Sequence, residues 1–178
     1  MAKITIISGC PGSGKSTLSE HLANQHENGV HIQTDRFYHF LTHRLDPSTP
    51  ESKTQNTAVV KAFTSAARSF HDNGYEVFID GVIGPWWFDV IQEQLLDFDW
   101  VYLHADLDTV LHRTAKRAEA TQASAHPELV RTMHSQFDAI AGELPLEQAA
   151  SLFRRHCQSQ IYHRETVARP EGEQHVQV

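Results

Sequence analysis

The chain has 178 residues, of which 40% are hydrophobic and 21% are charged, as is ordinary for one globular domain. Its formal net charge of −7 argues against sequence-independent binding to nucleic acid or to an anionic membrane surface. Two distant cysteines give no disulfide framework, no signal peptide precedes the first apolar segment, and no apolar run reaches membrane-spanning length, so we expect a cytoplasmic protein without membrane contact.

Short apolar runs alternate with helical patterns along most of the chain. The runs are typical of buried strands, and the helical patterns repeat apolar residues three and four positions apart. This alternation predicts an α/β fold with three α/β/α layers around a mainly parallel sheet. The predicted strands cover 3–8, 30–34, 75–79 and 100–104. The predicted helices cover 16–23, 36–45, 56–71, 86–96, 108–120, 127–141 and 143–156.

Residues 9–16 match the pattern G-x-x-x-x-G-K-[ST], and they lie between a predicted strand and a predicted helix. In such a P-loop, or Walker A motif, glycines let backbone N–H groups turn towards a phosphate, and the helix N-terminus favours an anion. Lys15 supplies positive charge to the β- and γ-phosphates, and the Ser16 hydroxyl is a Mg²⁺ ligand. The motif therefore predicts that ATP and Mg²⁺ bind to Gly9, Cys10, Pro11, Gly12, Ser13, Gly14, Lys15, Ser16 and Thr17.

Two carboxylates, Asp35 and Asp80, each follow a predicted strand. Because ligands of parallel sheets sit beyond the carboxyl ends of the strands, we expect both carboxylates to share one cleft with the P-loop. Each carboxylate also has a simpler explanation. Asp35 would suit the N-cap of the helix predicted at 36–45, and the Asp-Gly pair at Asp80 would suit a turn.

The arrangement of these motifs resembles the small P-loop kinases. Besides the P-loop and the two carboxylates, it includes Arg113 and Arg117, four residues apart on the helix after the fourth strand. This superfamily includes shikimate and gluconate kinases, chloramphenicol phosphotransferase and zeta-toxin-type sugar-nucleotide kinases. The chain is most similar to the chloramphenicol phosphotransferase-like or AAA_33-like ATP-binding proteins, which share the His-Ser-Gln-Phe run found here at 134–137.

The resemblance implies a phosphotransferase that moves the γ-phosphoryl group of Mg-ATP to a hydroxyl of a small molecule. It implies that Asp35 accepts or orients the proton of that hydroxyl, and that Asp80 holds Mg²⁺ together with Ser16. Arg113 and Arg117 would belong to a helical lid, at about 106–137, that stabilises the transferring phosphoryl group. The two arginines could instead form a solvated basic face.

Cys10 lies inside the P-loop itself. Nearby N–H donors are expected to lower the pKa of its thiol, which would favour oxidation and block nucleotide entry.

The pattern changes after residue 138. The apolar β-branched run of a fifth strand is missing at 138–146, and the short strand suggested at 160–163 is out of order. We expect a single domain over 1–166 and a flexible tail over 167–178. The altered C-terminus keeps a regulatory ATP-binding protein with little phosphotransfer open as an alternative. A further alternative keeps the transfer chemistry and changes the acceptor: a toxin-like sugar-nucleotide kinase or a nucleic-acid end kinase. The composition does not indicate the oligomeric state.

Overall fold

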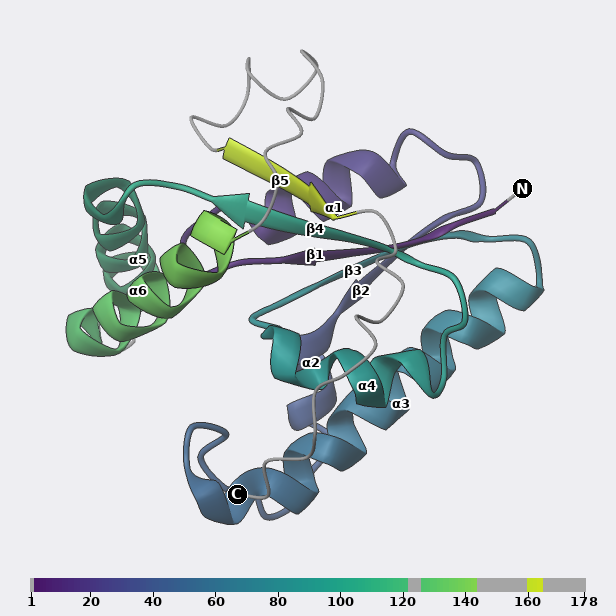
Figure 1. Cartoon of the computed structure of the whole chain (residues 1–178), viewed down its shortest axis with the longest axis horizontal. Coiled ribbons are helices and arrows are strands. Elements are labelled where there is room, and N and C mark those ends of the chain that lie inside the picture. Colours follow the sequence, from purple (N-terminus) through teal and green to yellow (C-terminus); the bar gives the residue numbers. More distant parts are fainter. Residues whose placement is uncertain (1, 122–125, 144–159, 165–178) are drawn as a thin grey trace.

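A computed structural model describes residues 2–121, 126–143 and 160–164 (Figure 1). In this part of the chain, five strands form one sheet in the order β2-β3-β1-β4-β5. The first four strands are parallel, which confirms the predicted fold class, and β5 runs antiparallel to β4. The strands are β1 (Ile4–Ser8), β2 (Gly29–Gln33), β3 (Glu76–Gly81), β4 (Asp99–His104) and β5 (Gln160–Arg164).

Helices cover both faces of the sheet and its carboxyl end. Figure 1 shows α1 on one face and α2, α3 and α4 on the other, while α5 and α6 lie side by side beyond the end of β4. None of the helices in the described ranges has the length and apolar character needed to span a membrane. The helices are α1 (Lys15–Ala23), α2 (Thr34–Tyr38), α3 (Lys53–Asp72), α4 (Phe88–Gln92), α5 (Leu107–Thr121) and α6 (Pro127–Glu143), with 3-10 turns at Pro50–Ser52 and Pro85–Trp87.

The register of the parallel strands brings the ends of three strands to the same level. Asp80 of β3 is paired with Ile7 of β1 on one side and with Gln33 of β2 on the other. Because β1 leads into the P-loop and β2 leads into α2, the residues that follow these strands meet at one edge of the sheet. This edge is where the sequence predicts the cleft.

The sheet is apolar on both faces, as expected of buried parallel strands. Alternate residues of β1 face opposite sides, so Ile6 packs in the cluster beneath α3 and α4, whereas Ile7 packs with Leu18 of α1. The larger cluster includes Phe63 of α3, which is only 2% exposed and meets the ring of Phe37 edge-on. The two apolar layers hold the strand ends in fixed positions.

Replacing Phe63 with Ala is expected to lower the free energy of unfolding by about 3–5 kcal/mol, because it leaves a large cavity in a packed core. Phe70 lies on the same helix but is 41% exposed, so Phe70→Ala should cost roughly 1 kcal/mol or less. Urea unfolding of the two variants measures the difference. Equal losses would contradict the assignment of the core to this side of α3.

Two predicted helices are shorter than expected. The helix predicted at 36–45 ends at Tyr38, because the following residues bury little apolar surface that would support further turns. The backbone of Leu45 instead pairs with the side chain of Gln55, at 2.8 Å and 3.1 Å. The helix predicted at 86–96 is divided between a 3-10 turn that starts at Pro85 and the short helix α4.

The C-terminal predictions have different outcomes. The strand suggested at 160–163 is confirmed as β5, which extends the sheet beside β4. The helix predicted at 143–156 begins at the end of α6, and its remainder lies outside the described residues, as does the tail at 167–178.

Candidate active site

The P-loop joins the end of β1 to the start of α1 through left-handed glycine conformations. Gly12 and Gly14 have φ values of 83° and 103°, which residues with a Cβ rarely adopt. Gly14 is also the N-cap residue of α1, and a glycine brings no capping side chain. The first N–H groups of α1 are therefore suited to an anion rather than to a side-chain oxygen.

Lys15 is the first residue of α1, and its side chain is buried beneath the loop. It is 8% exposed, and its Nζ donates a hydrogen bond to the Cys10 carbonyl oxygen at 2.8 Å. Burial lowers the pKa of Lys15 to about 8, while the nearby Cys10, Asp80 and Asp35 raise this pKa and Arg117 lowers it further. These groups therefore surround the position that the sequence assigns to the transferred phosphate.

The pKa of Lys15 predicts a pH dependence of ATP affinity. The ammonium loses its proton as the pH rises through about 8, whereas bound phosphates favour the charged form. We therefore expect full affinity below that pH, and above it a loss that approaches tenfold per pH unit. Calorimetric titration with a non-hydrolysable ATP analogue, from pH about 6.5 to about 9.5, measures this. An affinity that stays constant across that range would contradict the assignment.

Ser16 and Asp80 form a hydroxyl–carboxylate pair next to Lys15. The Ser16 hydroxyl donates to Asp80 Oδ2 at 2.6 Å, and His31 Nε2 lies 2.5 Å from Asp80 Oδ1. Asp80 itself is 5% exposed. Hydroxyl and carboxylate oxygens are suitable Mg²⁺ ligands, so the residues present fit the ion that the P-loop implies. The turn explanation accounts for neither contact of the Asp80 side chain.

Asp35 lies in the first turn of α2, with an exposed side chain. The N-cap residue of this helix is Gln33, so the N-cap explanation of Asp35 is wrong. The start of α2 packs closely on the end of β3, where a Cβ on Gly81 would lie 2.0 Å from Thr34 Oγ1. That close approach places the Asp35 carboxylate at the same edge of the sheet as Asp80 and Lys15.

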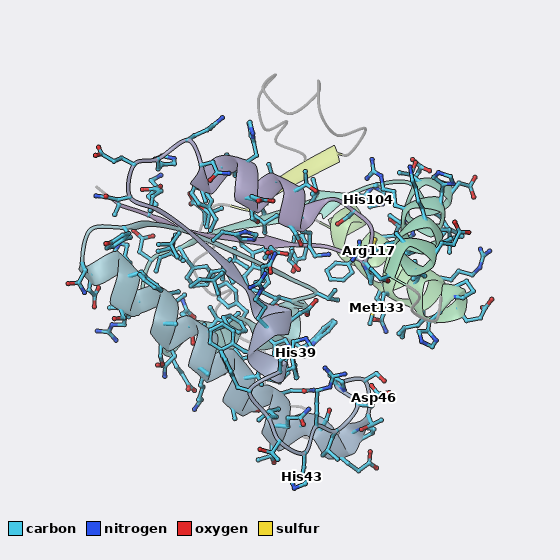
Figure 2. All side chains as sticks on the ribbon, turned by 180° about the vertical axis from the view of Figure 1, so that it is seen from behind. His39, His43, Asp46, His104, Arg117 and Met133 are labelled. Atoms are coloured by element: carbon cyan, nitrogen blue, oxygen red, sulfur yellow. The ribbon has the colours of Figure 1, made fainter. Side chains whose placement is uncertain are left out.

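The two arginines of α5, Arg113 and Arg117, have different surroundings. Arg113 donates to the carbonyl oxygens of Gly12 and Ser13, at 3.3 Å and 3.5 Å, and so fastens α5 to the P-loop. Arg117 is exposed, and its charge acts on Lys15. Figure 2 shows Arg117 on the side of α5 that faces the sheet. The geometry therefore favours Arg117 for contact with phosphate and Arg113 for positioning the loop.

The prediction for the Cys10 thiol is wrong. Cys10 is 2% exposed, and burial raises the pKa of its thiol above the ordinary value, although the charge of Lys15 lowers it in part. The side chain packs in the core beneath the loop instead of facing the phosphate site. Its backbone carbonyl is the part of Cys10 that contacts Lys15.

His31 is a site residue that the sequence does not reveal. It lies inside β2, where the sequence shows only a polar residue of an alternating strand, and its side chain is half-buried. Its contact with Asp80 depends on the register of β2 against β3, in which Gln33 pairs with Asp80. His31 lies two residues before Gln33 and on the same face of the sheet, so its ring reaches the Asp80 carboxylate. Only that register, which is a tertiary fact, identifies it.

Comparison with models of known protein families gives a match to the sequence of this chain. A family model of the AAA domain, AAA_33, matches residues 4–140, and no curated protein matches the chain.

Several solved structures share the fold at low sequence identity. A chain of the Pnkp1/Rnl/Hen1 RNA repair complex has a TM-score of 0.64 and 20% identity over 85% of this chain, which spans half of that chain's length. The shikimate kinase from Acinetobacter baumannii has a TM-score of 0.55 and 18% identity, covering 84% of this chain and 87% of its own. A gluconokinase from Sinorhizobium meliloti 1021 has a TM-score of 0.52 and 16% identity, covering 76% and 74%.

These matches confirm the resemblance to small P-loop kinases that the sequence motifs indicate. The family model covers the P-loop, Asp35, Asp80 and both arginines of α5. The protein belongs to the AAA_33 family of AAA domains and has a kinase-like P-loop fold.

Proposed function

We propose that the protein is an ATP-dependent phosphotransferase that moves the γ-phosphoryl group of Mg-ATP to a hydroxyl of a small molecule. One observation carries this proposal. The Ser16–Asp80 pair lies beside the buried Lys15, and the exposed Asp35 follows the adjacent strand. A phosphate site and a separate carboxylate for the acceptor are the two parts that phosphoryl transfer needs.

In this proposal the chain binds ATP by exchanging internal contacts for contacts with phosphate. The ammonium of Lys15 leaves the carbonyl oxygen of Cys10 and donates to phosphate oxygens, while the N–H groups of the loop and of α1 surround the phosphates. The Cys10 carbonyl oxygen keeps a hydrogen bond from the Ser13 backbone at 3.3 Å, so the exchange does not leave it unpaired.

Transfer then needs one proton acceptor. The acceptor oxygen forms a bond to the γ-phosphorus as the bond from that phosphorus to the ADP oxygen breaks, and Asp35 takes the hydroxyl proton. Mg²⁺, when bound, neutralises charge between the β- and γ-phosphates. Ser16 and Asp80 would hold the ion, with His31 keeping Asp80 in orientation, and Arg117 would face the transferring group.

A small hydroxyl compound is the acceptor class that the observations support best. Two solved structures with this fold are named as a gluconokinase and a shikimate kinase. The net charge of −7 disfavours a nucleic-acid acceptor, although a chain of an RNA repair complex also shares the fold. The acceptor panel should therefore hold sugars, sugar acids, cyclic hydroxy acids and an oligonucleotide with a 5′-hydroxyl.

The test is to incubate the chain with γ-labelled ATP, Mg²⁺ and this panel, and to follow the label. We expect label on a small hydroxyl compound, and a loss in kcat of about 10²-fold or more in Arg117→Ala. Arg113→Ala is the matched variant on the same helix. It should lower the thermal midpoint more than Arg117→Ala does, and it should lower kcat less than Arg117→Ala does. ATP binding without transfer to any panel member would favour a regulatory protein, and label on the oligonucleotide alone would favour an end kinase.

A further inference from the structure

Three ligand-type side chains meet on the side of the P-loop away from Asp35. His104 is the last residue of β4, and His134 and Asp138 lie one turn apart on α6. One ligand atom from each lies within 4.8 Å of the other two. His134 Nδ1 is 3.1 Å from Asp138 Oδ2, and His104 Nε2 contacts Asp138 Oδ1. Nothing in the proposed phosphotransfer uses this cluster.

The hydrogen bonding of His134 prepares it to act as a metal ligand. Its Nε2 lies 2.8 Å from the carbonyl oxygen of Ala105, which can only accept, so Nε2 carries the proton. In the neutral ring Nδ1 therefore holds the lone pair, and this atom is directed at Asp138. Metal-binding histidines commonly have one nitrogen fixed in this way by a backbone carbonyl.

The three side chains of the cluster differ in burial: both histidines are shielded from solvent, and the aspartate is exposed. The side chain of His134 is 8% exposed, that of His104 is 19% exposed and that of Asp138 is 46% exposed. An ion could therefore enter from the side of Asp138 and keep one position for water. Tetrahedral Zn²⁺ with ligands at about 2.0–2.1 Å places neighbouring ligand atoms about 3.3 Å apart. The 3.1 Å separation of His134 and Asp138 is already close to that spacing.

We propose that His104, His134 and Asp138 bind one Zn²⁺ ion, with water as the fourth ligand. Two imidazoles and a carboxylate are a donor set that suits Zn²⁺ and that Mg²⁺, which prefers oxygen ligands, does not favour. The ion would link the lid helix α6 to the end of β4. His104 also lines a small cavity with Gly9 and Cys10, so the linked strand end adjoins the start of the P-loop.

The test is metal binding by the untagged chain of 178 residues after treatment with a chelator. Zn²⁺ is titrated against a competing chelating dye, and Co²⁺ replaces it for visible spectroscopy of the coordination geometry. We expect one equivalent of Zn²⁺, a low-symmetry Co²⁺ spectrum and a rise in the thermal midpoint. His104→Gln and His134→Gln should each weaken binding at least about tenfold, and Asp138→Asn should weaken it as well.

The chain has 13 histidines, so matched controls are needed. His39→Gln and His43→Gln remove exposed imidazoles from the region near α2, far from His104 (Figure 2), and should leave the stoichiometric site unchanged. Circular dichroism and ATP binding establish that each variant is folded, and the strand-end variant His104→Gln serves if His134→Gln does not fold. The proposal is overturned if the wild type binds no stoichiometric Zn²⁺, or if the cluster variants bind it as tightly as the wild type.

Discussion

Lys15→Met is expected to remove phosphotransfer and to weaken ATP binding strongly, without unfolding the protein. The change deletes the one cation buried beneath the P-loop in the described part of the chain, and such a loss in a desolvated site costs on the order of 10²–10³ in kcat. Methionine keeps the length and apolar stem of lysine, and it removes the cost of burying an ammonium. The thermal midpoint should therefore stay at or above that of the wild type.

The matched control for this variant is Lys3→Met. The side chain of Lys3 is 68% exposed, and its contact with Asp99, at 3.7 Å, lies at the surface. Neither ATP affinity nor turnover should change in this variant. Calorimetric titration with ATP and a coupled assay for ADP measure both quantities in each protein. Wild-type turnover in Lys15→Met would show that phosphate does not bind in this loop.

Asp35→Asn is expected to separate binding from transfer. The amide keeps the shape of the carboxylate but cannot accept the proton of the acceptor hydroxyl, and loss of a general base costs about 10²–10⁴ in rate. Since Asp35 is exposed and caps no helix, the variant should fold normally. ATP affinity should change little, because Asp35 is one of several charges around Lys15 rather than a phosphate ligand.

Asp89→Asn is the control for Asp35→Asn. Asp89 is an exposed carboxylate in the first turn of α4, just as Asp35 is in the first turn of α2, but it takes no part in the proposed site. Single-turnover transfer from γ-labelled ATP should drop in Asp35→Asn and not in Asp89→Asn. Full transfer by Asp35→Asn would remove the base assignment and would leave the fold and the P-loop unaffected.

The predictable parts of this protein are those encoded by local patterns. The P-loop is contiguous, and its pattern by itself predicts separate roles for its glycines, for Lys15 and for Ser16. Strands alternate with helices, so the parallel sheet and the convergence of Asp35 and Asp80 at its edge follow from general rules of such folds. The pairing of Ser16 with Asp80 is the direct product of that convergence.

The parts that could not be predicted depend on tertiary contacts. His31 reaches Asp80 only through the register of two strands, and Cys10 faces the core rather than the phosphates. The end of α2 at Tyr38 reflects missing apolar burial rather than a breaker residue. Arg113 and Arg117 lie four residues apart on one face of α5, so the sequence gives no reason to assign them different roles. Only the packing of α5 places Arg113 against the backbone of the P-loop.

The most direct test of phosphotransfer measures ADP and phosphorylated acceptor in the same samples over time. With the acceptor found in the panel, we expect one phosphorylated product for each ADP, and little ADP when the acceptor is left out. The same ADP rate with and without acceptor, with the label released as inorganic phosphate, would contradict the kinase and show an ATPase in its place.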